Sequence, residues 1–252
     1  MQRRLLCVAI SSVILTAVPA AAQVSFDQDA YVLGMGDSVM AGAQFYAGRF
    51  VFRQGQSSTP SIAVGNIALR GARSWELRDH QVPQVLCART ALRPTIVTMI
   101  AGAGDVFGFD FDIAAITGRV AEAVTLLLNN EFLSNPVRDP VTGLPCPRLS
   151  NVTILVGNYY SIPLVEGLPP QVPQLLQSFN ATLAAAIAAV PVPPGSRLAL
   201  VDLYTPSLDR NGLVLIERRG GFDGPFEFDP HPTNAGYAFI EQQFQAVLDS
   251  LP

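Results

Sequence analysis

The stretch Tyr31-Val32-Leu33-Gly34-Met35-Gly36-Asp37-Ser38 decides the fold, because the short apolar run Tyr31–Met35 is followed there by a glycine and two polar residues. Similar runs, without strict alternation of apolar and polar residues, recur at Ile96–Ile100, Val152–Val156 and Leu198–Leu203, and a weaker one lies at Ser61–Leu69. Strands of a parallel sheet that is covered on both faces have this pattern. We therefore predict five strands.

Two other stretches carry apolar residues at helical spacing. The stripes consist of Leu176, Phe179, Leu183, Ile187 and Val190, and of Ile240, Phe244, Val247, Leu248 and Leu251. Pro191 should end the first helix, and Pro232-Thr233-Asn234 should begin the second. A Pro-rich stretch at 135–147 is predicted to be a long surface loop. The predicted fold class is α/β: a three-layer α/β/α sandwich with a mainly parallel five-stranded sheet.

The first 22 residues have the layout of a secretory signal peptide. Arg3 and Arg4 precede an apolar run from Leu5 to Val18, and small residues at Ala20-Ala21-Ala22 precede Gln23. The run is short for a membrane span, although an uncleaved anchor is the alternative. We predict that residues 1–22 are removed and that 23–252 form a single domain. That domain is expected to be secreted or periplasmic, with no stable membrane insertion after cleavage.

The composition argues against several classes of function. The chain is 49% hydrophobic and 14% charged, which is typical of a globular protein. All 16 basic residues are Arg, the net charge is −4 and no basic run occurs, so nucleic acid is not expected as a partner. Two His and three Cys leave little material for a metal cluster, and neither a metal nor an organic cofactor is expected. The oligomeric state is left open.

Cys87 and Cys146 are the two cysteines that follow the predicted signal peptide. An oxidising compartment favours their pairing. In the chain-entropy model such a bridge, closing a loop of about 59 residues, adds roughly 4 kcal/mol to stability. Two buried free thiols are the alternative, and the disulfide is the preferred prediction.

Ser38 and His231 are the candidate nucleophile and base. Ligands of a parallel sheet bind at the carboxyl ends of its strands, and Ser38 follows the first predicted strand. His231 lies between two prolines, just before the last predicted helix. A serine hydroxyl needs a base that accepts its proton near neutral pH, and His is the usual one. A serine at a helix start can also be only an N-cap, and His80 looks like an ordinary polar helix position.

These residues resemble the sequence blocks of the SGNH, or GDSL-type, hydrolase superfamily. Gly36-Asp37-Ser38 is similar to the first block, and residues 66–74, Asn-Ile-Ala-Leu-Arg-Gly-Ala-Arg-Ser, are similar to the second. Gly102-Ala103-Gly104-Asp105 aligns with the third, and His231-Pro232-Thr233 looks like the last. The resemblance covers the mature chain and implies the flavodoxin-like SGNH fold and a serine esterase. The N–H groups of Ser38 and Gly71 would then hold the oxyanion.

Gly104 departs from the third block, in which the family has an Asn. That Asn side chain donates to the oxyanion, and losing one such donor lowers the rate about 100- to 1,000-fold. The N–H of Gly104 itself is a candidate replacement, and Asn158, after the next strand, is a distant one that we do not favour. If the missing donor limits activity, Gly104→Asn should raise it.

The acid that orients His231 is also shifted. The family's acid precedes the His by three residues, where this chain has Phe228, whereas Asp229 precedes it by two. Residues i and i+2 share a side in an extended segment, and a residue before proline favours that geometry. Asp229 is therefore the preferred acid, with Glu227 and Asp223 in reserve. Orientation by a backbone carbonyl is the alternative.

The sequence also leaves alternatives to the esterase. Gly102-Ala103-Gly104 lacks the third glycine of a dinucleotide loop, and residues 109–112 lack the ligand spacing of a calcium loop and should begin a helix. A domain that only binds its ligand, or turns it over weakly because of Gly104, is one alternative, and an acyltransferase is another. The expected substrate is a small-molecule, lipid or carbohydrate ester. Tyr159 and Tyr160 are candidates for lining its pocket or for packing.

Overall fold

The computed structural model describes residues 31–41, 63–88, 94–108, 110–162, 170–208, 210 and 231–251. Its strands are β1 (Tyr31–Gly36), β2 (Ala63–Asn66), β3 (Ile96–Ile100), β4 (Thr153–Gly157) and β5 (Arg197–Val201). Its helices are α3 (Ser74–Glu76), the π-helical turn η1 (Leu77–Gln81), α4 (Val82–Leu86), α5 (Ala103–Phe107), α6 (Ile113–Asn129), η2 (Asn130–Phe132), α7 (Val172–Ala188), η3 (Thr205–Ser207) and α8 (Asn234–Ser250). The predicted signal peptide lies outside the described residues.

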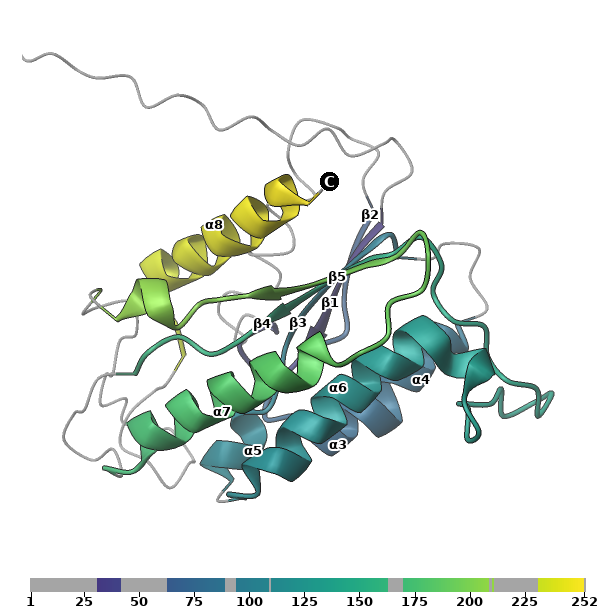
Figure 1. The fold of residues 1–252 in the computed structure, drawn as a ribbon, viewed down its shortest axis with the longest axis horizontal. Helices are drawn as coiled ribbons and strands as arrows, with labels where there is room; N and C mark the ends of the chain where they lie inside the picture. The colour runs from purple at the N-terminus through teal and green to yellow at the C-terminus, as the bar shows by residue number, and fades with distance from the viewer. Residues whose placement is uncertain are drawn as a thin grey trace, which may run out of the picture.

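The five strands form one parallel sheet in the order β2-β1-β3-β4-β5 (Figure 1). Every residue of β3 and β4 is buried, as expected for strands covered on both faces. All five predicted strands are present, and their bounds differ from the predictions by at most three residues. β5 ends at Val201 instead of Leu203, because the Leu203 N–H donates to the Asn158 side chain, at 2.6 Å, and not to a strand.

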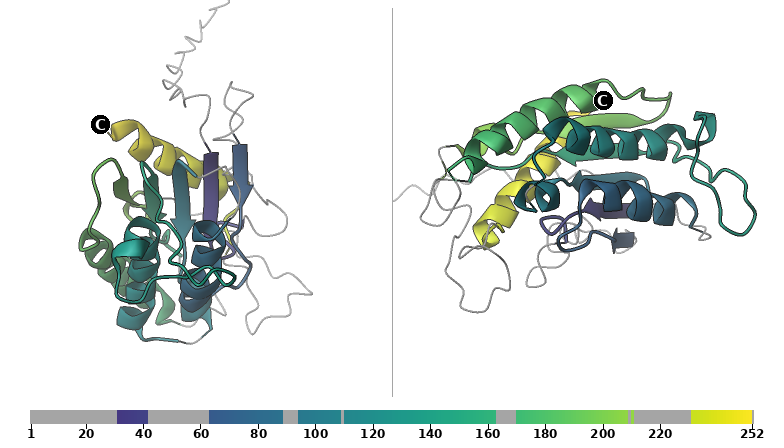
Figure 2. Two further views of the ribbon diagram at one scale, coloured as in Figure 1. Left: turned by 90° about the vertical axis from the view of Figure 1, so that its right-hand side faces the viewer. Right: turned by 90° about the horizontal axis from the view of Figure 1, so that it is seen from below.

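Helices cover both faces of the sheet, so the predicted three-layer sandwich is confirmed (Figures 1 and 2). Among the described residues α8 lies on one face, and α3 to α7 lie on the other, where α6 packs along α7. The predicted stripe of α7 faces the core, since Leu176, Phe179, Leu183 and Ile187 are all buried. Ile240 and Phe244 of α8 are buried in the same way.

Both predicted helix starts are confirmed by their caps. The Thr233 hydroxyl accepts the Gly236 N–H at 3.0 Å at the start of α8, and the Asp112 carboxylate accepts the Ala115 N–H at 3.0 Å at the start of α6. The Pro-rich stretch is a loop, as predicted, with one short bridge between Arg138 and Pro145. None of the described helices is both long enough and apolar enough to cross a membrane.

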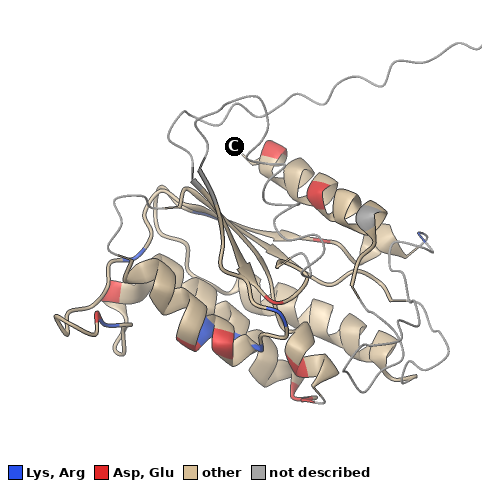
Figure 3. Cartoon of the chain, turned by 180° about the vertical axis from the view of Figure 1, so that it is seen from behind, with Lys and Arg blue, Asp and Glu red and all other residues tan. Residues whose placement is uncertain are grey.

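In the cartoon of Figure 3, the basic and acidic residues of the described part are interspersed, and the basic ones form no continuous stripe. Arg78 forms ion pairs with Asp79 and Glu122, and Arg148 pairs with Glu131.

Candidate active site

Ser38 lies on the turn that follows β1, at the side of the sheet where the parallel strands end, which we call the carboxyl edge. The Asp37 N–H continues the ladder to the Ile100 carbonyl at 3.0 Å, and the chain then turns so that the Ala41 N–H donates to the Asp37 carbonyl at 2.9 Å. The Asp37 carboxylate accepts the Val39 N–H, at 3.0 Å, inside the same turn. Asp37 is buried and Ser38 is half-buried, so the turn presents the serine side chain at the sheet edge.

His231 meets Ser38 from the other end of the chain. Its Nε2 lies 2.7 Å from the Ser38 Oγ, although 193 residues separate the two. The position follows from α8, because His231 comes directly before the Thr233 cap of that helix. This is the geometry that a serine nucleophile and its general base require. The candidate acids Asp229, Glu227 and Asp223 lie outside the described residues.

Gly71 lies on the turn that follows β2, and two hydrogen bonds tie this turn to the segment around Ser38, while a third closes the turn itself. The Leu69 N–H donates to the Gly36 carbonyl at 3.1 Å. Asn66 donates its amide to the Met40 carbonyl at 3.0 Å and accepts the Ala68 N–H at 2.9 Å. The Gly71 turn therefore cannot move freely relative to the turn that carries Ser38.

Gly104 packs against the backbone of the Gly71 turn. A Cβ placed on Gly104 would lie 2.4 Å from the Ala72 carbonyl oxygen and 2.9 Å from the Gly71 carbonyl oxygen. Both obstacles are main-chain atoms, which yield far less readily than the end of a side chain. The expectation that Gly104→Asn raises activity does not survive this geometry, because the added side chain would displace the Gly71 turn.

Asp37 is the centre of a buried network that joins three strand ends. The Tyr159 hydroxyl, beyond β4, donates to the Asp37 carboxylate and accepts the Ala103 N–H at 2.8 Å. The Ala103 N–H also lies 3.2 Å from the Asp37 carboxylate. Burial raises the pKa of Asp37 from 3.8 to about 6, although the hydrogen bonds from Tyr159, Val39 and Ala103 oppose that rise.

A second buried carboxylate, Asp105, ties α5 to the start of α3. It accepts the Ser74 N–H at 2.6 Å and the Ser74 hydroxyl at 3.1 Å. Arg119 of α6 lies 3.7 Å from Asp105 and donates to the Ser74 hydroxyl at 3.3 Å. Burial raises the pKa of Asp105, and the two bonds from Ser74 oppose this. Since Ser74 follows Gly71 by three residues, Asp105 fixes the far end of the Gly71 turn.

Asn158, Tyr159 and Tyr160 have contacts away from the Ser38 hydroxyl. Asn158 donates to Asp202 at 2.9 Å and accepts the Leu203 N–H, so its amide links the ends of β4 and β5. Tyr159 and Tyr160 are only 2% and 3% exposed, so both pack in the core. No group of three or more potential metal-binding His, Cys, Asp or Glu side chains occurs in the part of the chain that the structure describes.

The sequence pattern predicted no role for Asp37, Asp105 or Gln81, and for Tyr159 it predicted only pocket lining or packing. Gln81 interrupts an apolar stripe that includes Leu77 and Val85, and a polar side chain at such a position is a sign of a specific buried partner. The two aspartates lie inside the first and third sequence blocks, but only the folded chain shows from which N–H groups they accept hydrogen bonds.

Known structures share this fold. A lipolytic protein of the G-D-S-L family from Veillonella parvula DSM 2008 superposes with a TM-score of 0.55 at 16% identity, over 88% of this chain and 99% of that one. A carbohydrate esterase of family 3 from Talaromyces cellulolyticus does so with a TM-score of 0.54 at 13% identity, over 87% and 96% of the two chains.

The salicylyl-acyltransferase SsfX3 from a tetracycline biosynthetic pathway has the fold as well. Its TM-score is 0.51 at 12% identity, over 90% of this chain and 56% of that protein. No protein-family model matches the sequence, and no curated protein matches it either. At these identities the likeness establishes the fold, and the predicted SGNH-hydrolase fold is thereby confirmed.

Proposed function

We propose that this chain is an exported serine esterase that hydrolyses carboxylic esters through an acyl-enzyme on Ser38. The 2.7 Å contact between the Ser38 Oγ and the His231 Nε2 carries the proposal. A buried or merely capping serine has no need of an imidazole at that distance. The fold shared with lipolytic proteins and a carbohydrate esterase supports the same conclusion.

The proposed reaction has two halves. In the first, the Ser38 Oγ attacks the ester carbonyl while the His231 Nε2 takes the hydroxyl proton. The tetrahedral intermediate then breaks its bond to the alcohol oxygen, which leaves with the proton from His231. In the second half, water gives a proton to His231 and attacks the acyl-Ser38 carbonyl. The carboxylic acid leaves, and Ser38 recovers its proton.

The oxyanion would be held by main-chain N–H groups of Ser38, Gly71 and Gly104. Among the described residues none of these three N–H groups has a hydrogen-bond partner. Unpaired, fixed N–H groups of this kind stabilise a developing negative charge without reorganisation. The close packing of Gly104 supports such a hole, because the family's Asn side chain has no room there.

Asp229 is the proposed acid that holds the tautomer of His231, with Glu227 and Asp223 as the reserves. The test is a set of single substitutions to the amide, Asp229→Asn, Glu227→Gln and Asp223→Asn. Asp229→Asn should lower kcat by about 10⁴-fold if it presents the wrong tautomer. Retained kcat in Asp229→Asn, with loss in one of the other two, would reassign the acid.

Hydrolysis of p-nitrophenyl esters of increasing acyl length by residues 23–252 tests the function. Ser38→Ala and His231→Gln should each lower kcat by at least about 10³-fold. The matched controls are Ser178→Ala, an exposed serine of α7, and His80→Gln, the other histidine, and both should retain full activity. Esterase activity that survives Ser38→Ala would refute the proposal.

Two further measurements separate the alternative functions. Labelling of Ser38 by a fluorophosphonate, without ester turnover, would favour a binding or highly selective domain. Formation of a new ester when an alcohol or sugar is added would reveal an acyltransferase, the activity of the SsfX3 protein that shares the fold.

Export is proposed from the layout of residues 1–22, and the disulfide described below supports it. Expression of the full chain in a bacterium should deliver a protein that begins at Gln23 outside the cytoplasm. A cytoplasmic product that retains Met1 would contradict this.

A further inference from the structure

Gln81 is a fully buried polar residue on the helical face of the sheet, outside the Ser38–His231 pair. It lies at the end of the π-helical turn η1, where the Val82 N–H donates to the Leu77 carbonyl five residues earlier. Pro83 follows and has no N–H for the Asp79 carbonyl, so a regular α-helical turn would leave that carbonyl unpaired. Short π-helical turns are frequent at functional sites.

The Gln81 amide binds both main-chain groups of Gly36. The Gly36 N–H donates to the Gln81 Oε1 at 2.7 Å, and the Gln81 Nε2 donates to the Gly36 carbonyl at 2.8 Å. Gly36 is the last residue of β1 and has a φ of +122°. A Cβ there would lie 1.9 Å from the Ile100 carbonyl oxygen, so the strand end has no free space in which to shift toward β3.

The Gly36 carbonyl accepts a second hydrogen bond, from the Leu69 N–H at 3.1 Å. Gly36 precedes Ser38 by two residues, and Leu69 precedes Gly71 by two. The same carbonyl therefore joins the segment that carries the proposed nucleophile to the segment that carries the proposed oxyanion donor. Gln81 holds that junction from the helical layer.

We infer that Gln81 is a positioning residue for the esterase reaction, which sets the Ser38 Oγ relative to the Gly71 N–H. This inference rests on the proposed function. Gln81 does not touch the reacting atoms and acts through the two main-chain groups of Gly36. Misplacement of a catalytic group by 1 Å costs on the order of 100-fold in rate, so loss of this clamp affects the chemical step more than substrate binding.

The test compares Gln81→Met with Asn130→Leu, each close to the natural side chain in size. Asn130 is also fully buried and also clamps main-chain groups: it accepts the Val137 N–H at 2.7 Å and donates to the Cys146 carbonyl at 2.7 Å. It lies at the opposite edge of the sheet. Both variants lose a buried clamp of the same kind, and only one of the two clamps is next to Ser38.

The measured quantities are kcat and KM for a p-nitrophenyl ester and the second-order rate of Ser38 labelling by a fluorophosphonate. Gln81→Met should lower kcat and the labelling rate by about 10- to 100-fold while KM stays within about twofold. Asn130→Leu should change neither rate. Gln81→Asn, which keeps an amide one methylene shorter, should give an intermediate kcat and serves as the readout if Gln81→Met does not fold.

Unchanged kcat in a folded Gln81 variant would overturn the inference, and so would an equal fall in kcat for Gln81→Met and Asn130→Leu. Ser38→Ala, measured alongside, separates the two possible failures. If Ser38→Ala is inactive while Gln81→Met is fully active, the inference alone fails. Turnover that survives in Ser38→Ala removes the proposed function and the inference with it.

Discussion

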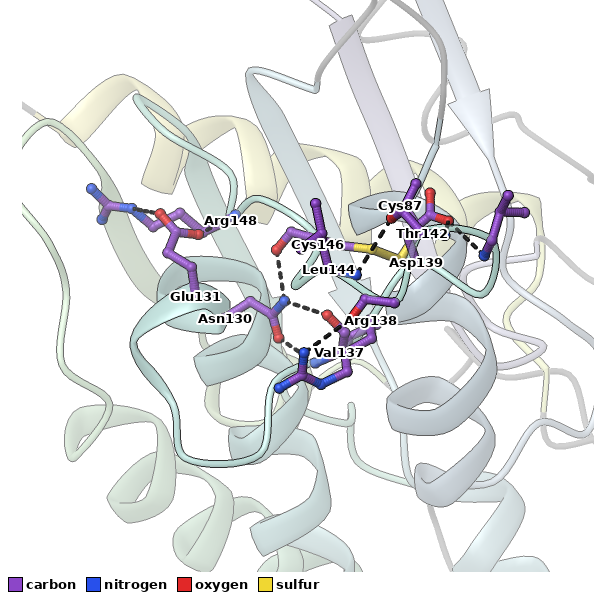
Figure 4. Close-up of a disulfide and its surroundings, with 12 residues drawn as sticks. Cys87, Asn130, Glu131, Val137, Arg138, Asp139, Thr142, Leu144, Cys146 and Arg148 are labelled. Atoms are coloured by element: carbon purple, nitrogen blue, oxygen red, sulfur yellow. Dashed lines mark hydrogen bonds and ion pairs between the residues drawn. A yellow bond between two sulfur atoms is a disulfide. The ribbon is translucent and has the colours of Figure 1, made fainter.

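The carboxyl edge of the sheet and the amino edge, at which the strands begin, are held together in different ways. At the carboxyl edge, noncovalent bonds to the buried carboxylates Asp37 and Asp105 connect the segments around Ser38. At the amino edge, a disulfide joins Cys87, after α4, to Cys146 in the long loop before β4, and the neutral amide of Asn130 clamps the same loop (Figure 4).

The difference shows where this fold accepts an energetic cost. A carboxylate taken out of water destabilises the folded chain unless several donors surround it, and burial raises the pKa of both aspartates. A disulfide and a buried amide carry no such charge. The carboxyl edge keeps the costly groups because each accepts N–H donors from segments that must stay aligned for the proposed reaction.

The largest effect is expected from removing the covalent link at the amino edge. Replacement of Cys87 and Cys146 together by Ala should lower the free energy of unfolding by about 4 kcal/mol. At temperatures at which the variant remains folded, kcat/KM should equal that of the wild type, because the link is remote from Ser38. Chemical denaturation and ester hydrolysis measure the two quantities. A large fall in kcat/KM would show that the amino edge affects catalysis as well as stability.

Asp37 should give the carboxyl edge a pH dependence of its own. Its pKa in the folded chain is about 6, above the ordinary 3.8, so between these values the folded state holds the additional proton. The contribution of this protonation to the free energy of unfolding is complete below pH 3.8. It is lost as pH rises through 6, a change of about 3 kcal/mol.

Denaturation from pH 4 to 7.5 tests this, with Asp37→Asn as the reference. The unfolding free energy of the wild type minus that of Asp37→Asn should fall by about 3 kcal/mol as pH rises. Tyr159→Phe removes a hydrogen bond that lowers the pKa of Asp37, so the fall in the free energy of unfolding should move to higher pH. Parallel profiles for wild type and Asp37→Asn would contradict the assignment.

Substitution of Asp105 tests whether the second buried carboxylate affects catalysis as well as stability. Asp105→Ala leaves the buried Ser74 N–H without its acceptor and should cost about 2–3 kcal/mol of stability. It should also lower kcat/KM by about 10-fold, because the far end of the Gly71 turn is released. Asp110→Ala, which removes the other carboxylate near Arg119 from a more exposed position, is the control and should keep full activity.

The parts of the fold that follow from local pattern were predicted correctly. β3 and β4 are buried on both faces, and uninterrupted apolar runs at Ile96–Ile100 and Val152–Val156 carry that information directly. Ser38 and His231 were both singled out, one by its position after a strand and one by its place before a helix, and the structure puts them in contact. Such positions follow from topology, which a regular α/β pattern determines.

The other contacts of the candidate site depend on which segments, far apart in the chain, lie close together in the fold. No local pattern tells that Gln81 reaches Gly36, 45 residues away, or that the Tyr159 hydroxyl reaches Asp37 across 122 residues. The environment of Gly104 is of the same kind. Its residue type suggested a lost side chain, whereas its surroundings indicate that another segment occupies the space.

Gly104 allows the smallest and sharpest test of how tightly the carboxyl edge is packed. Gly104→Ala adds a single methyl group, 2.4 Å from the Ala72 carbonyl oxygen, and should cost about 2 kcal/mol of stability and lower kcat by displacing the Gly71 turn. Gly118→Ala is the matched control: it lies on α6, exposed, with no atom within 4 Å of the added Cβ. A helix-interior Gly→Ala change should stabilise the chain by about 0.5–1 kcal/mol and leave kcat unchanged. If Gly104→Ala instead matches wild type in both stability and kcat, the Gly71 turn can yield, and Gly104→Asn again becomes a route to higher activity.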